Sequence, residues 1–156
     1  MATNRGKQFE AKLKEDWQKL ENSTIDRLYD SVSGYKSISN ISDFIAYCFP
    51  NIFYLEAKSI HGNTFPLVNL SQYDKLLKKV GIKGVRVGVV IWFIDHSKVL
   101  YVPISTIKQL KKDKKKSVNI RTIFDEGYVV YELPSIKKKV FCDTDYSILL
   151  SLKEGE

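Results

Sequence analysis

The stretch Ile52-Phe53-Tyr54-Leu55-Glu56-Ala57-Lys58 reads as an apolar β-strand that ends in an acid-x-Lys triplet. Side chains two residues apart in a strand leave the same face about 7 Å apart, so the Glu56 carboxylate and the Lys58 ammonium should be neighbours. The same triplet spacing occurs at Glu10, in a helical segment, and at Asp113, in a lysine run. Only the triplet at Glu56 lies at the end of a predicted strand. This position, rather than the residue types alone, makes it a candidate for a functional site.

A partner strand precedes this stretch. Residues 42–49 predict a strand, and Pro50-Asn51 predicts the turn of a hairpin with residues 52–59. Asp43 lies at the start of that first strand. The hairpin is therefore expected to bring the carboxylate of Asp43 beside that of Glu56.

The spacing leaves two interpretations open. In the first, Glu56 and Lys58 are a solvated pair on an edge strand. In the second, Asp43, Glu56 and the carbonyl of Ala57 hold Mg²⁺, which binds carboxylates, carbonyls and waters. Such an ion activates a water for attack on a phosphodiester. Lys58 would then orient that water or stabilise the negative charge that develops.

The rest of the chain predicts an α/β fold, with a mixed central β-sheet flanked by helices. Apolar residues at helical spacing over 7–21 predict a first helix, and Ser71 and Ser105 are expected to cap two more. Residues 85–94 are β-branched and apolar on both faces, which predicts a buried central strand. An irregular loop is expected over 61–66, and further strands are expected at 25–29, 99–102 and 128–132.

Composition predicts a single globular domain over residues 1–156, with 44% hydrophobic and 28% charged residues. Cys48 and Cys142 are too few for a disulfide framework, which favours a reducing compartment. The polar start does not resemble a signal peptide, and no apolar stretch is long enough to cross a membrane, so we expect a cytoplasmic protein. With only His61 and His96, a histidine-based zinc site or a Ser-His-Asp triad is disfavoured.

The formal net charge is +7, and most of the 25 basic residues are lysines. Such a surplus favours a polyanionic partner, most simply nucleic acid, although a solvated lysine-rich surface would have the same composition. The candidate phosphate contacts are Arg5 and the lysine run Lys111, Lys112, Lys114 and Lys115.

The spacing of Asp43 and Glu56-Ala57-Lys58 resembles the core motif of the PD-(D/E)xK nuclease superfamily. Within it, the chain is similar to the RecU-type Holliday junction resolvases of low-GC Gram-positive bacteria and their phages. Asn4-Arg5-Gly6 with Glu10 matches the opening of that family, and Thr64-Phe65-Pro66-Leu67 matches a segment that precedes its His-Gln pair.

The resemblance implies a restriction-endonuclease-like core and Mg²⁺-dependent cleavage of four-way DNA junctions, with Mn²⁺ able to substitute. It carries over Glu10 as an outer acidic ligand and Gln72 as a residue that orients a ligand or the water. Paired symmetric nicks imply a homodimer with a site in each subunit. The location would be the cytoplasm, or the host cytoplasm if a phage encodes the protein.

The sequence departs from the family in two places, and the second concerns recognition of the junction. Ser71-Gln72 stands where the family has His-Gln, and the stalk that enters the junction is shortened to residues 30–40. Tyr35 and Lys36 in this stretch are candidate contacts to an unstacked branch point. Two alternatives stay open: another PD-(D/E)xK nuclease, restriction-like or specific for flaps or single strands, and a non-catalytic DNA-binding module whose acidic cluster is structural.

Overall fold

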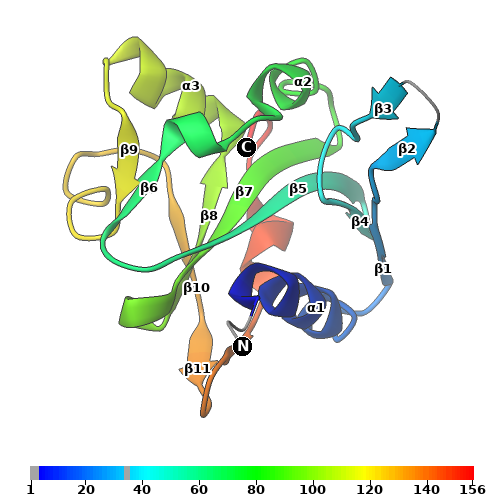
Figure 1. Cartoon of the computed structure of the whole chain (residues 1–156), viewed down its shortest axis with the longest axis horizontal. Helices are drawn as coiled ribbons and strands as arrows, with labels where there is room; N and C mark the ends of the chain where they lie inside the picture. Colours follow the sequence, from blue (N-terminus) through cyan, green and yellow to red (C-terminus); the bar gives the residue numbers. More distant parts are fainter. Residues whose placement is uncertain (1–3, 34–35) are drawn as a thin grey trace.

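A computed structural model describes residues 4–33 and 36–156 of the chain. Its centre is a six-stranded sheet with the strand order β1-β4-β5-β7-β8-β10 (Figure 1). β5 and β7 run parallel, and the other neighbouring strands run antiparallel, so the sheet is mixed, as predicted. The bounds are β1 Ser23–Arg27, β4 Phe44–Cys48, β5 Asn51–Ile60, β7 Val85–Phe93, β8 Lys98–Pro103 and β10 Tyr131–Leu133.

The other elements lie around this sheet. Three pairs of short strands form separate antiparallel ladders: β2 (Ser31–Ser33) with β3 (Lys36–Ile38), β6 (Thr64–Pro66) with β9 (Ser117–Asn119), and β11 (Ser135–Lys137) with β12 (Cys142–Thr144). The helices are α1 (Arg5–Trp17), α2 (Tyr73–Leu77) and α3 (Ile104–Lys112), and the 3₁₀ turns are η1 (Leu67–Asn69), η2 (Ile94–His96) and η3 (Ser147–Ser151).

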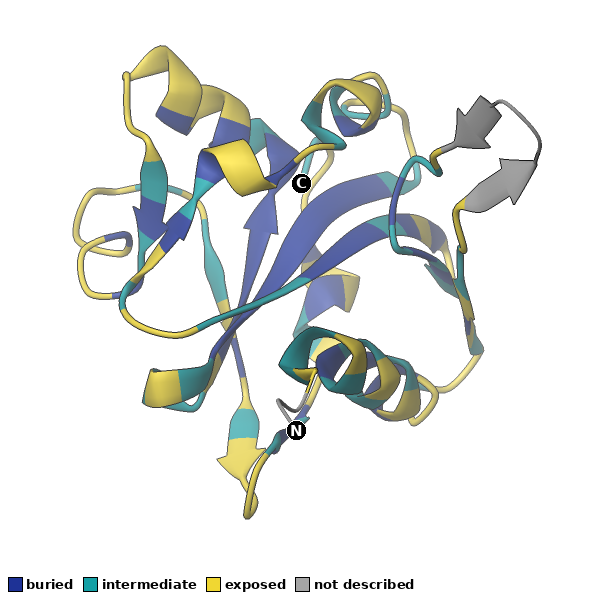
Figure 2. Ribbon diagram, in the orientation of Figure 1, coloured by how far each residue is buried: buried dark blue, intermediate teal, exposed yellow. Residues whose placement is uncertain are grey.

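Both faces of the sheet are covered. On β7, Val90 and Trp92 pack into a core beneath α1 and η3, whereas Val89 and Ile91 pack into a second core beneath α2, α3 and β6. The central strands are buried almost throughout, and the outer faces of the helices are exposed (Figure 2). A strand covered on both faces needs apolar side chains on both, which explains the continuous apolar run of β7. The predicted buried central strand is confirmed.

Helix α1 packs through Phe9, Leu13 and Trp17, all buried, whereas Leu20, the fourth residue of the predicted apolar stripe, lies beyond the end of the helix. The Trp17 ring meets Phe53 of β5 edge-on, with centroids 5.0 Å apart. Asn4 caps the helix by accepting a hydrogen bond from the backbone N–H of Lys7, at 3.1 Å. α1 ends at Trp17, earlier than predicted, because the chain turns back over the next residues to begin β1.

Some local predictions are wrong. Ser71 does not cap α2, which begins at Tyr73 and has Gln72 at its cap position without a side-chain hydrogen bond. Ser105 lies inside α3, because β8 continues to Pro103 and the helix begins directly after this proline. The region over 61–66 is not wholly irregular, since its second half forms β6 against β9. The last strand of the sheet, β10, begins at Tyr131, later than predicted.

The side chain of Tyr101 on β8 packs directly against a glycine of β7. Tyr101 of β8 is fully buried, and its hydroxyl donates to the carbonyl of Glu156 at 2.7 Å. Its ring lies across Gly88 of β7, where a Cβ atom would overlap the ring. Gly88 is therefore required by this packing rather than by its backbone conformation.

Among the helices of residues 4–33 and 36–156, none combines the length and the apolar character needed to cross a membrane.

Candidate active site

The hairpin of β4 and β5 places the two carboxylates together. Its register pairs Phe44 with Leu55, so Asp43, which directly precedes β4, comes opposite Glu56. The Oδ2 atom of Asp43 accepts a hydrogen bond from the backbone N–H of Ala57 at 2.9 Å. The predicted proximity of Asp43 and Glu56 is confirmed.

Glu56 lies on the face of the sheet that α2 and α3 cover, and only 2% of its surface is exposed. Its Oε2 atom is 3.2 Å from Nζ of Lys58, as the same-face prediction requires. Its Oε1 atom is buried and has no hydrogen-bond partner among the described residues. Burial and the nearby Asp43 carboxylate raise the pKa of Glu56 to about 7, and Lys58 only partly opposes them.

A polar cavity of about 400 Å³ opens over these side chains. We refer to it as the Asp43 cavity. Gln72 lines it from the turn before α2, so the structure brings Gln72 to the same cavity as the carboxylates. The lining residues are Arg27, Leu28, Tyr29, Asp30, Asn40, Ser42, Asp43, Glu56, Lys58, Ser71 and Gln72.

The donor set of the Asp43 cavity fits a divalent metal ion. Two adjacent carboxylates are the protein ligands that Mg²⁺ commonly takes. A buried carboxylate oxygen without a partner is costly, and a cation beside it would remove that cost. Asp43 and Glu56 would hold the ion. The contact seen at Ala57 involves its N–H, so the carbonyl of Ala57 as a third ligand stays a prediction.

Glu10 reaches this site indirectly. It belongs to α1, on the other side of the sheet from Glu56, and its Oε2 atom is 2.8 Å from Nε of Arg27. Nη2 of Arg27 is in turn 3.7 Å from Oδ1 of Asp43, and Nη1 donates to the Asp43 carbonyl at 3.0 Å. Within the described part of the chain, no three His, Cys, Asp or Glu side chains gather to form a metal site. The guanidinium of Arg27 thus lies between Glu10 and Asp43. Glu10 as a ligand of the metal ion stays a prediction.

Arg27 is the residue that the sequence reasoning missed. Its guanidinium lies over the rings of Tyr29 and Phe44, 5.3 Å and 5.5 Å from their centroids. Burial works against its charge, but hydrogen bonding to Glu10 and the charges of Glu10 and Asp43 outweigh burial and raise the pKa of Arg27. The sequence offered only an arginine in the middle of the strand expected at 25–29, whereas in the structure Arg27 ends β1 and pairs with Phe44, the neighbour of Asp43.

The other predicted contacts lie away from the Asp43 cavity or outside the description. Arg5 donates to Gln8 and lies 5.9 Å from the ring centroid of Phe141. Tyr35 lies outside the described residues, and Lys36 is the first residue of β3.

The lysine run lies on the exposed surface at the end of α3. Nζ of Lys111 is 4.4 Å from the ring centroid of Tyr73, which follows Gln72, whereas Lys115 forms an ion pair with Glu126 at 3.0 Å. Contact between these lysines and phosphate stays a prediction for Lys111, Lys112, Lys114 and Lys115.

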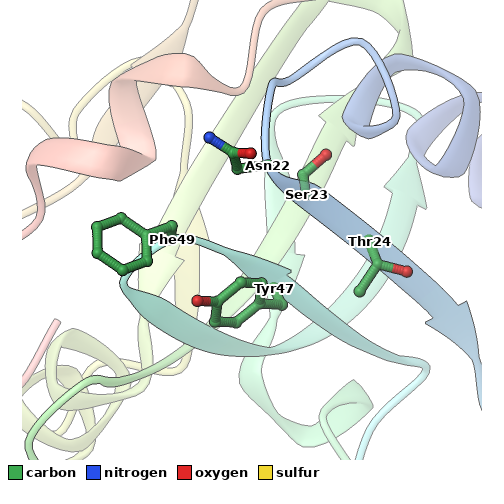
Figure 3. Close-up of a pocket in the computed structure, with 5 residues that line it drawn as sticks. All are labelled: Asn22, Ser23, Thr24, Tyr47 and Phe49. Carbon is green, nitrogen blue, oxygen red and sulfur yellow. The ribbon is translucent and has the colours of Figure 1, made fainter.

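A different cavity, of about 600 Å³, lies at the far end of β1 and β4 (Figure 3). The sheet register pairs Ser23 with Cys48 at that end, whereas Asp43 precedes the other end of β4. Its lining contains no carboxylate, lysine or histidine, so it offers no acid-base or metal chemistry like that of the Asp43 cavity. The lining residues are Asn22, Ser23, Thr24, Tyr47 and Phe49.

No protein-family model matches the sequence, and no curated protein matches it. Among solved structures, the chain is similar to that of Hjc, a Holliday junction resolvase from the archaeal hyperthermophile Archaeoglobus fulgidus. The TM-score is 0.56 at 14% sequence identity, and the match covers 76% of this chain and 91% of that chain. The likeness establishes a shared fold of the restriction-endonuclease-like type, as predicted. This likeness does not support membership of the RecU-type subfamily or an origin in phage or Gram-positive bacteria. Both rest only on the resemblance of the sequence.

Proposed function

We propose that this protein is a metal-dependent DNA endonuclease that nicks branched DNA, most simply a four-way Holliday junction. The observation that carries the proposal is the pairing of Asp43 with a buried Glu56, whose Oε1 atom lacks a partner in the described structure. The position of both at one end of a β-hairpin, within a fold shared with a resolvase, supports it.

Four side chains of the Asp43 cavity have a role in the proposed reaction. Bound Mg²⁺ or Mn²⁺ would activate a water and neutralise charge on the phosphodiester. Asp43 and Glu56 would hold the ion. Lys58, whose ammonium lies against Glu56, is placed to stabilise negative charge on the phosphate oxygens. Gln72, on the cavity wall, orients the water or a ligand by hydrogen bonding.

The partner in this proposal is DNA, and the working unit is a homodimer. The net charge of +7 favours a phosphate backbone. A four-way junction is resolved by two symmetric cuts, and a two-fold dimer supplies two sites in matching orientation. Sedimentation of the free protein and of its junction complex tests this part, and a monomer in both would contradict it.

The test of activity is incubation with a synthetic four-way junction and either Mg²⁺ or EDTA, read on a denaturing gel. Paired symmetric nicks that need the metal are expected. A linear duplex of the same sequence and a flapped duplex are the matched substrates. No cutting of any of the three with Mg²⁺ or Mn²⁺ would contradict the nuclease proposal.

One observation favours a second candidate, a nuclease of the same core without junction preference. β2 and β3, which occupy the place of the family's stalk, have three residues each. Such a hairpin is too short to cross the open centre of a junction. Equal rates on the junction and the linear duplex would favour this candidate over a resolvase.

A further inference from the structure

A third cavity, of about 430 Å³, lies on the α1 side of Arg27, and we refer to it as the Tyr29 cavity. It shares Arg27 and Tyr29 with the Asp43 cavity, so these two side chains form the boundary between both. Its volume is within the range of about 300–1,000 Å³ that is typical of small-ligand sites. The lining residues are Lys7, Glu10, Ala11, Lys14, Arg27, Tyr29 and Phe44.

The backbone of Tyr29 is held in place, whereas its aromatic ring is exposed to solvent. Its carbonyl accepts a hydrogen bond from Nδ2 of Asn40 at 2.6 Å, and its ring rests on the guanidinium of Arg27. Even so, 78% of its surface is exposed. A held backbone and an exposed aromatic ring are what a base-stacking residue requires.

The charge of the Tyr29 cavity suits phosphate. Its carboxylate, Glu10, is already paired with Arg27 at 2.8 Å. Lys7 and Lys14 lie seven positions apart on α1 and therefore on one helix face. Neither forms an ion pair within the described part of the chain, so the cavity has uncompensated positive charge.

We infer that the Tyr29 cavity binds a nucleotide next to the cleaved phosphate, with its base stacked on Tyr29 and its backbone held by Lys7 and Lys14. This inference rests on the proposed function, because the neighbouring Asp43 cavity then holds the phosphate that is cut. A base leaves its neighbours to stack on protein at the lowest cost where the duplex is already interrupted, which favours a substrate with an unpaired or unstacked nucleotide beside the cut.

The test is a double-mutant cycle between Tyr29 and the base itself. Binding of a four-way junction is measured with a Glu56→Gln background, in which the DNA stays uncut. Tyr29→Leu is expected to weaken binding roughly 5- to 150-fold, the range for loss of one aromatic stack. An abasic nucleotide at the branch point should weaken wild-type Tyr29 binding by a similar factor, and the two changes together should add little.

Two controls accompany this cycle, one at another exposed aromatic residue and one at Tyr29 itself. Phe49→Leu removes an aromatic ring that is 69% exposed at the far end of β4, and we expect no coupling to the abasic nucleotide. Tyr29→Phe should bind like the unsubstituted chain, because stacking needs only the ring.

Lys7→Gln and Lys14→Gln should each lower the slope of log affinity against log salt by about 1. Melting temperatures report whether each variant is folded.

The outcomes separate this inference from the proposed function. If the unsubstituted protein cuts junctions but Tyr29→Leu neither weakens binding nor couples to the abasic nucleotide, the nucleotide site is wrong and the nuclease stands. Full additivity of the two changes would equally overturn the inference. If no DNA is cut but the coupling is found, the nuclease proposal falls and the nucleotide site stands. If the protein binds no DNA, both fall.

Discussion

The carboxylate of Asp43 is held by the backbone N–H of Ala57, at 2.9 Å, so the residue between Glu56 and Lys58 positions the acid across the hairpin. The relative positions of the Asp43, Glu56 and Lys58 side chains are thus set by one pair of strands, β4 and β5.

We expect Asp43→Ala or Glu56→Ala to abolish metal-dependent cleavage while DNA binding stays equal or becomes tighter, because a negative charge near phosphate is lost. Gel cleavage and fluorescence anisotropy measure the two effects. Near wild-type cutting by either variant would refute the assignment.

The raised pKa of Glu56 predicts an unusual pH dependence of stability without metal. The folded state holds a proton up to a pKa of about 7, whereas the unfolded chain releases it near the ordinary value of 4.5. The contribution of this group to the free energy of unfolding is therefore present below pH 4.5 and is lost as the pH rises to about 7. The loss is at most about 3 kcal/mol.

Chemical denaturation in EDTA between pH 5 and pH 8 checks this expectation, on a pH grid of roughly half a unit. Glu56→Gln, which stays neutral, should be the more stable protein at pH 8 and should lack this part of the pH dependence. Glu21→Gln changes an exposed glutamate and serves as the control. Parallel pH profiles for Glu56→Gln and the unsubstituted protein would show that Glu56 is not protonated in the fold.

Arg27 should act as a positioning residue. Arg27 contacts both Glu10 and Asp43. Arg27→Met is therefore expected to misplace the Asp43 carboxylate and to lower the cleavage rate at saturating metal by about 10-fold or more. Loss of a nearby cation should leave the metal concentration for half-maximal activity unchanged or lower. Arg121→Met, which removes an exposed arginine outside the Asp43 cavity, is the control for charge. A weaker apparent metal affinity with an unchanged maximal rate would contradict this role.

The lysine run is expected to track the DNA backbone. Replacing Lys111, Lys112 and Lys114 with Gln should lower the slope of log affinity against log salt by about 1 for each lysine that contacts phosphate. Lys115 is left in place because it pairs with Glu126. The same triple change at residues 137–139, which start at the last residue of β11 and lie far from α3 in Figure 1, matches the loss of charge. Equal slopes for both triple variants would mean that the run at α3 is simply a solvated surface.

Gly88→Ala should destabilise the fold. The new methyl group would overlap the fully buried ring of Tyr101, and overpacking of this kind costs about 1–3 kcal/mol. Gly6→Ala in α1 is the matched control, since its Cβ would meet only Asn4 and Ser59 at ordinary contact distances. We expect Gly6→Ala to be neutral or slightly stabilising, as alanine favours helix. Equal denaturation midpoints for the two variants would contradict the crossing of Tyr101 over Gly88.

The sequence predicted the features that depend on local periodicity. Alternation along a strand is enough to put Glu56 and Lys58 on one face, and a hairpin turn is enough to bring Asp43 beside them. The continuous apolar run of β7 similarly revealed a strand with both faces buried. Each of these predictions used only neighbours along the chain or across one turn.

The sequence did not predict which face of the central sheet each helix covers. Glu10 and Gln72 were both expected near the metal, but α1 packs on one face of the sheet and α2 on the other. Glu10 consequently meets Arg27 instead of Asp43, and no pattern in the sequence states that choice. The caps expected at Ser71 and Ser105 were wrong for a related reason: the tertiary path of β8 and of the turn before α2 decides where each helix begins.

The pairing of Asp43 with Glu56 across the β4–β5 hairpin also limits how the separation of these acids along the chain can change during evolution. Opposite residues of an antiparallel pair always share a face, so lengthening both strands by one residue keeps the acids together and adds two residues to their spacing. A single residue added to one strand alone would slip the register and send one acid to the other face. Unless the turn absorbs the insertion, relatives of this hairpin should therefore differ in acid-to-acid spacing by even numbers.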